Sequence, residues 1–136
     1  MKQIMSNELP ALEGSAKQIT WANDIREKCV NAFNAAVEMG STPTGSVLVP
    51  AEMKELNALA NAFGTVFFAV GMSKLGPRCQ AVAVASEKAC GFGSGRGLSK
   101  KEQLDHLPEF ERALYDLFTN ATNAKTYIDY MRHARV

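Results

Sequence analysis

The sequence predicts a mostly α-helical protein, folded as a compact bundle of about five helices with a glycine-rich loop. Apolar residues recur at three- and four-residue steps in several segments, and segments rich in glycine, proline or polar residues separate them. The chain of 136 residues, 46% hydrophobic and 21% charged, has the size and composition of one soluble domain. We therefore treat residues 1–136 as a single domain. One short strand pair in the middle stays open as an alternative.

The first helix is predicted over residues 15–40. Ser15 is an N-cap residue, whose side chain accepts a hydrogen bond from a free backbone N–H, and Gly40 suits the helix end. The apolar positions of this helix are Ile19, Ala22, Ile25, Cys29, Ala32 or Phe33, and Ala36 or Val37.

A second helix is predicted to begin at Pro50, after the turn-forming linker STPTGS, and to end at Gly76 and Pro77. Its apolar stripe includes Phe63, Phe67, Phe68 and Met72. Phe67 and Phe68 point to different faces of a helix, so one of them is a candidate interface residue. The run TVFFAV within this helix also fits a buried strand, and the alanine-rich residues 78–90 fit a helix or a short strand.

The remaining chain predicts a loop and two more helices. GFGSGRG, residues 91–97, carries four glycines in seven positions and predicts a flexible loop. Ser99 and Glu102 form the pattern of a capping box, which starts a helix, and Pro108 restarts it over about residues 108–119. Thr122 or Asn123 caps a last helix. The apolar residues of these two helices are Phe110, Leu114, Leu117 and Phe118, then Ala124, Tyr127, Ile128 and Met131.

Charge and cysteine usage narrow the classes of function. The net charge of +1 provides no overall attraction to nucleic acid or to an anionic membrane. Three cysteines without metal-site spacing predict buried thiols in a reducing compartment. The first ten residues lack a signal-peptide pattern, and residues 58–72 are too short and too interrupted for a membrane span. We therefore expect a cytoplasmic protein with no membrane association.

Residues 74–101 form a locally basic segment, whereas residues 102–120 carry five acids against one arginine. The glycine-rich loop, its basic residues and the helix start after it suggest a site for nucleic acid or phosphate, with Phe92 able to stack on a base. A solvated loop is the alternative, since the P-loop ending is missing and no confident strand precedes the glycines. The candidate residues are Arg78, Lys88, Phe92, Arg96, Lys100 and Lys101.

Helix docking is the second candidate role, between the first and last helices. Trp21 shares a stripe with Ile25 and Cys29, which predicts a buried indole whose N–H needs a polar partner. Arg26 is expected to pair with Asp129 across the two helices. The predicted docking residues are Ser15, Trp21, Ile25, Arg26, Ile128 and Asp129.

No catalytic residues, metal ligands or cofactors are predicted. Serine, histidine and acidic residues show no recognisable catalytic spacing, although such groups can converge in space from distant positions. The two histidines, His106 and His133, have no second ligand at a metal-site spacing and are expected on the surface.

The segment LEGSAKQITWANDIR resembles a segment of small, uncharacterised proteins of bacteriophages and mobile elements, and NAKTYIDYMR resembles their closing segment. Tyr127 stands where tryptophan is more usual in that group. The resemblance implies a non-enzymatic protein that inhibits a host defence system, for example as an anti-CRISPR, by binding a host defence protein or ribonucleoprotein complex. Two alternatives are a nucleic-acid-binding accessory protein acting through residues 74–101, and a nucleotide sponge or small enzyme. A homo-oligomer is also open.

Overall fold

The computed structural model describes residues 3–40, 50–90, 106–134 and 136. This part of the chain is helical, with an isolated bridge between Glu13 and Asn123 as its one β-type pairing. The expectation of a mostly α-helical bundle is therefore confirmed, and the alternative strand pair over residues 65–85 is wrong. The helices are α1 (Ala16–Gly40), α2 (Pro50–Val70), α3 (Pro77–Cys90), α5 (Leu107–Asn120) and α6 (Ala124–Thr126).

Helix α2 ends earlier than the sequence indicates. It stops at Val70, and Gly71 with φ of +94° turns the chain into the short 3-10 helix η2 (Met72–Lys74) before α3 begins at Pro77. A positive φ is costly for residues with a Cβ, so glycine is the natural residue for this break. The turn lets α3 fold back and pack along α2.

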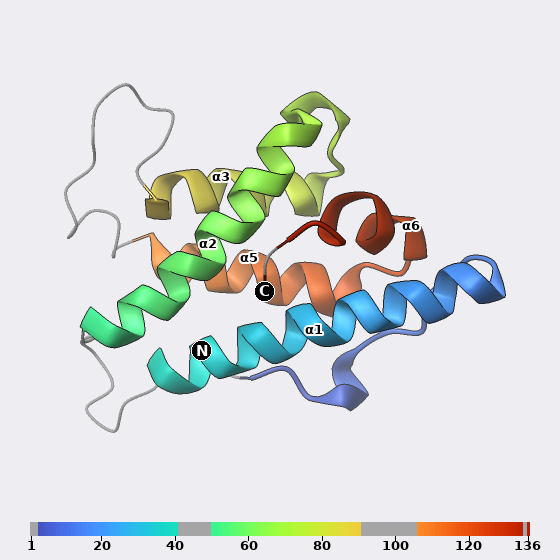
Figure 1. The fold of residues 1–136 in the computed structure, drawn as a ribbon, viewed down its shortest axis with the longest axis horizontal. Coiled ribbons are helices and arrows are strands. Elements are labelled where there is room, and N and C mark those ends of the chain that lie inside the picture. Colours follow the sequence, from blue (N-terminus) through green and yellow to red (C-terminus); the bar gives the residue numbers. More distant parts are fainter. Residues whose placement is uncertain (1–2, 41–49, 91–105, 135) are drawn as a thin grey trace.

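The bundle is arranged so that α2 packs against α3 and α1, and α3 packs against α5 (Figure 1). The aromatic core lies where these helices meet. Phe118 of α5 contacts Phe33 of α1 and Phe63 of α2 edge-on, with ring centroids 6.1 and 6.3 Å apart, and stacks on Tyr127 at 6.4 Å. Burial of these large apolar rings is the main stabilising contribution expected for a domain of this size.

The amino-terminal segment is hydrogen-bonded to two helices of the bundle. Asn34 of α1 accepts a hydrogen bond from the backbone N–H of Ile4 at 2.7 Å and donates one to its carbonyl at 2.9 Å. Tyr115 of α5 donates a hydrogen bond to Glu8 in η1 (Ser6–Glu8), and this bond is the main cause of a raised pKa for the Tyr115 phenol. The amino-terminal segment is thus held to both α1 and α5.

The carboxy-terminal segment closes against α1, as the sequence analysis expects. After α6, residues Tyr127–Met131 form a single turn of π-helix, η3, which packs against α1. Ile128 is buried there. None of the helices within the described residues has the length and apolarity that crossing a bilayer would require.

Candidate functional site

The start of α1 has a reciprocal cap and is preceded by a glycine with a positive φ. Ser15 and Gln18 cap the helix reciprocally: the Ser15 Oγ accepts from the Gln18 N–H at 3.2 Å, and the Gln18 Oε1 accepts from the Ser15 N–H at 3.0 Å. The predicted capping role of Ser15 is therefore confirmed. Gly14, with φ of +152°, brings the chain so close to the last segment that an added Cβ would lie 3.3 Å from the Ala124 Cβ.

This close approach joins segments from opposite ends of the chain. The Glu13 N–H donates to the Thr122 carbonyl at 2.7 Å, and the Ala124 N–H donates back to the Glu13 carbonyl at 3.0 Å. Asn123 then caps α6 by accepting from the Lys125 N–H at 2.9 Å. As a result, the first turns of α1 and the last helical turns of the protein lie side by side.

Trp21, the one tryptophan of the chain, lies on the outside of this junction with 46% of its surface exposed. The prediction that it belongs to the core is wrong. The buried stripe of α1 runs through Ala22, Ile25 and Cys29. At about 100° per residue, Trp21 instead shares its face with Asp24 and Lys28, one and two turns further on.

Arg132, which directly follows the π-helix, lies over the indole of Trp21. Its guanidinium carbon is 5.6 Å from the centroid of the Trp21 ring, within the range of a cation–π interaction. The Nε–H of Arg132 also donates to the Nε2 atom of His133 at 3.0 Å. Single turns of π-helix often occur at functional positions, and here the turn leads directly into the residue that covers Trp21.

Beside Trp21 and Arg132 is a depression of about 390 Å³, which we call the Trp21 site. Its buried apolar members include Ile25, Cys29 and Met131, and its exposed charged members are Asp24, Lys28 and Arg132. Such a combination of apolar floor and polar rim is typical of a site that receives a side chain or a small ligand. The complete lining is Trp21, Asp24, Ile25, Lys28, Cys29, Met131, Arg132, Ala134 and Val136.

The thiols near the core are not activated for catalysis. Burial raises the pKa of Cys29 to about 12 and that of Cys79 to about 11, so both are protonated at neutral pH. A nucleophilic cysteine needs the thiolate, which a raised pKa disfavours. The Trp21 site therefore offers shape, an aromatic ring and charge, which are the means of binding.

Arg26 holds a structural position rather than the predicted ion pair with Asp129. Arg26 is buried, with 8% of its surface exposed. Its guanidinium donates to the Pro10 carbonyl at 2.7 Å and to the Asn23 Oδ1 at 2.9 Å. Its guanidinium carbon lies 5.9 Å from the Tyr127 ring centroid. Asp129 is exposed and is not among these partners, so this expectation is corrected.

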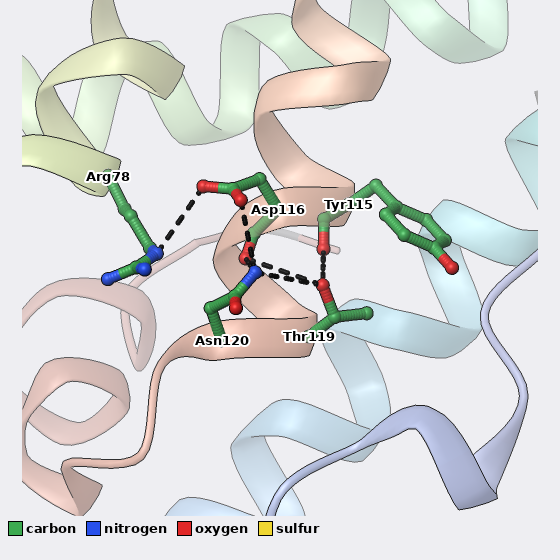
Figure 2. A network of polar contacts seen from close by, with 5 residues as sticks. All are labelled: Arg78, Tyr115, Asp116, Thr119 and Asn120. Carbon is green, nitrogen blue, oxygen red and sulfur yellow. Dashed lines mark hydrogen bonds and ion pairs between the residues drawn. The ribbon is translucent and has the colours of Figure 1, made fainter.

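Two of the predicted nucleic-acid-binding residues face acids on α5. The Arg78 Nε is 3.4 Å from the Asp116 Oδ2, and the Asp116 Oδ1 also accepts from Asn120 at 3.0 Å (Figure 2). The Lys88 Nζ is 3.7 Å from a Glu109 oxygen. Each carboxylate partly neutralises the positive potential of its partner, so Arg78 and Lys88 attract a phosphate less strongly than unpaired cations would. Phe92, Arg96, Lys100 and Lys101 lie outside the described residues.

Outside the Trp21 site, the polar side chains of the described residues do not form a metal-binding cluster. Within the described ranges there is no group of three or more histidine, cysteine or acidic residues placed to hold a metal ion. His133 is exposed, as predicted, while His106 is partly buried and lies 3.5 Å from Glu109. The hydroxyls of Ser86 and Tyr127 are buried without a hydrogen-bond partner among the described residues.

The sequence pattern predicts a role for Trp21, but in the core, and it indicates neither Lys28 nor Met131 for a site. The signal for Lys28 was present, because Asp24 and Lys28 follow Trp21 at the spacing of one helical face. The contact between Trp21 and Arg132 joins residues more than a hundred positions apart, and no local pattern predicts it.

No protein-family model, no curated protein and no solved structure matches the chain significantly.

Proposed function

We propose that this protein is a non-enzymatic phage or mobile-element protein that binds a protein component of a host defence system, with the Trp21 site as its contact surface. The observation that carries the proposal is the half-exposed Trp21 with Arg132 over its ring, beside a depression with an apolar floor. A CRISPR-Cas effector is the first candidate partner, and the site of action is the host cytoplasm.

The residue types at this site are those that dominate binding energy at protein interfaces. Tryptophan and arginine are enriched among the residues whose truncation costs most, and such residues cluster in pockets that a partner desolvates. Arg132 restrains the Trp21 ring before any partner arrives, because its guanidinium already covers one face of the indole. A side chain ordered in advance loses less conformational entropy on binding.

The Trp21 site lies where the two segments that carry the resemblance meet. The two resembling segments, LEGSAKQITWANDIR and NAKTYIDYMR, are far apart in sequence. The structure packs them against each other, with Trp21 supplied by the first and Arg132 by the second. If the group shares a binding surface, these two segments are therefore where it would lie.

The test measures protection of a targeted phage in a bacterium with a defined CRISPR-Cas system. Expression of the protein is expected to raise the efficiency of plating in that strain and to have no effect in a strain lacking the system. Trp21→Ala should abolish the protection, since truncating an interface tryptophan commonly costs about 2 kcal/mol or more of binding energy. Asn31→Ala, on an exposed position of α1, is the matched control and should protect like the wild type.

A direct binding measurement separates this proposal from the alternatives. The purified effector should bind the wild type with micromolar affinity or better and bind Trp21→Ala at least tenfold more weakly. Loss of protection with no change in binding would contradict the assigned site. Binding to DNA or RNA that is steeply salt-dependent and lost in Arg96→Glu/Lys100→Glu would instead favour the nucleic-acid accessory function.

A further inference from the structure

The side chains around the Trp21 site carry more positive than negative charge. Asp24, Lys28 and Arg132 line the depression, and all three are exposed. Among the described residues, none of the three has an ion-pair partner. Asp24 and Lys28 lie one helical turn apart on α1, so their opposite charges offset each other in the surrounding potential. The positive charge that remains is that of Arg132.

Arg132 is restrained from two sides before any partner arrives. Its guanidinium lies over the Trp21 ring, and its Nε–H is hydrogen-bonded to His133. In the part of the chain that the structure describes, the terminal N–H groups of this guanidinium have no hydrogen-bond partner. They form a planar fork that matches the two oxygens of a carboxylate. A partner that covers them must supply an acceptor, because a buried N–H without one costs free energy.

The floor of the site suits an apolar group. It is formed by the buried side chains of Ile25, Cys29 and Met131. Burial raises the pKa of the Cys29 thiol to about 12, so the floor carries no charge at neutral pH. An apolar side chain that enters the depression removes apolar surface from water, which favours binding. The site thus combines a place for an apolar group with a fixed cation at its edge.

We propose that the Trp21 site recognises an acidic peptide segment, in which an aspartate or glutamate stands next to an apolar residue. The apolar side chain packs on Ile25 and Met131 beside the indole. The carboxylate accepts hydrogen bonds from Arg132, and Lys28 adds a second attraction. This inference rests on the proposed function, because it takes the Trp21 site as the surface that contacts the partner protein.

A nucleic-acid strand fits the same site less well. Single-strand binding relies on a positively charged groove along the phosphates and on aromatic rings on which bases stack. At this site Arg132 already covers one face of the indole, and Asp24 would repel a phosphate. Charged groups at an interface contribute mainly to specificity and to the rate of association. We therefore expect the carboxylate to determine which segment is chosen more than how tightly it is held.

Selection from a random heptapeptide display library on the immobilised full chain tests the proposal. Peptides retained by the wild type and lost on Trp21→Ala are expected to carry an aspartate or glutamate beside a leucine, isoleucine, valine or phenylalanine. Phe68→Ala is the matched control and should retain the same peptides. Phe68 is 40% exposed on α2, beside the fully buried Phe67, and is not part of the lining.

Titration of an enriched peptide then measures the role of charge, with the fluorescence of the one tryptophan in the chain as the signal. Replacing the acid of the peptide by its amide should weaken binding about three- to tenfold at low salt, and about 1 M salt should remove most of the difference. Arg132→Gln and Lys28→Glu should each weaken binding. Asp24→Asn should strengthen it, whereas Glu27→Gln removes the same charge from an exposed position outside the lining and should change it less.

Three outcomes would overturn the proposal. One is a selection that returns basic peptides, or no peptides that depend on Trp21. Another is an affinity that does not respond to the charge at Lys28 and Arg132. The third is tighter binding of an oligothymidylate strand than of any selected peptide, which would assign the site to nucleic acid. Because the selection needs no host protein, its failure is distinct from a failure of the phage-protection assay.

The two assays can therefore disagree, and each disagreement has one reading. Protection that depends on Trp21 without an acidic preference would overturn this inference and leave the proposed function in place. An acidic preference without protection would overturn the assignment to host defence and leave the peptide site in place.

Discussion

Arg26 of α1 lies against Tyr127 of η3, with its guanidinium carbon 5.9 Å from the centroid of the tyrosine ring. The two residues connect the first and the last helical segments through a buried cation–π contact. The guanidinium also satisfies the Pro10 carbonyl, so three separate parts of the chain converge on one side chain. A buried charge costs free energy unless hydrogen bonds and neighbouring groups compensate it, and here they do.

Replacing Arg26 should destabilise the fold, while replacing Asp129 should not. Arg26→Ala leaves the Pro10 carbonyl and Asn23 without their partner and is expected to lower the free energy of unfolding by about 1–3 kcal/mol. Asp129→Ala, at an exposed position, is expected to change it by less than about 0.5 kcal/mol. Urea denaturation measures both values. An equally large loss in Asp129→Ala would contradict the assignment of Arg26 to Pro10 and Asn23 rather than to Asp129.

Gly14 is expected to be intolerant of a side chain. Gly14→Ala places a Cβ 3.0 Å from the Gln18 Oε1 and 3.3 Å from the Ala124 Cβ, at a φ of +152° that residues with a Cβ rarely adopt. Strain of this kind costs about 1–3 kcal/mol, which thermal denaturation should report as a lower melting temperature. Gly76→Ala is the matched control, because its added Cβ meets nothing within 4 Å and its φ is not positive. A melting temperature unchanged in Gly14→Ala would contradict the close packing of the two chain ends.

The protein should lose stability in alkaline solution. The pKa values of Cys29 and Cys79 rise from 9.0 to about 12 and about 11 because burial disfavours the thiolate. In the unfolded chain both thiols ionise near pH 9, so above that pH the unfolded state releases protons that the folded state keeps. Folding stability is therefore complete below pH 9 and falls as the pH rises towards the folded-state values, by about 1.4 kcal/mol per pH unit for each thiol.

Urea denaturation between pH 8 and pH 11 checks this dependence. Cys29→Ala removes one titrating group, so the decline in its free energy of unfolding with pH should be shallower than in the wild type. Tyr127 contributes in the same direction, because burial raises the pKa of its phenol more than Arg26 lowers it. Identical slopes in wild type and Cys29→Ala would show that this thiol is not the group that titrates.

The ion pair between Arg78 and Asp116 should matter little to stability. The two side chains are 51% and 55% exposed, and such pairs contribute about 0–1 kcal/mol. Asp116→Asn is expected to reduce the free energy of unfolding by no more than this amount, and high salt should abolish the difference by screening. A larger loss that persists in high salt would contradict this assignment, because salt screens the attraction between two exposed charges.

Much of the fold follows from local pattern. The cap at Ser15, the proline at the start of α2 and the apolar periods of α1 and α5 are visible in the sequence, and the helices begin near the predicted residues. The runs TVFFAV and AVAVA are ambiguous, because β-branched residues alone do not separate a buried helix from a buried strand. Their burial against neighbouring helices in α2 and α3 resolves them as helical.

Local sequence patterns are enough to predict a helical domain, the residues at which the main helices start and the residues that are candidates for contact. Three features become visible only in the folded chain: Trp21 is exposed, Arg26 contacts Pro10 and Tyr127 rather than Asp129, and Arg132 lies over Trp21. Helix periodicity depends on neighbours three and four residues apart, so it can be seen locally. The Trp21 site depends on how the two ends of the chain pack, and that packing is a property of the folded bundle.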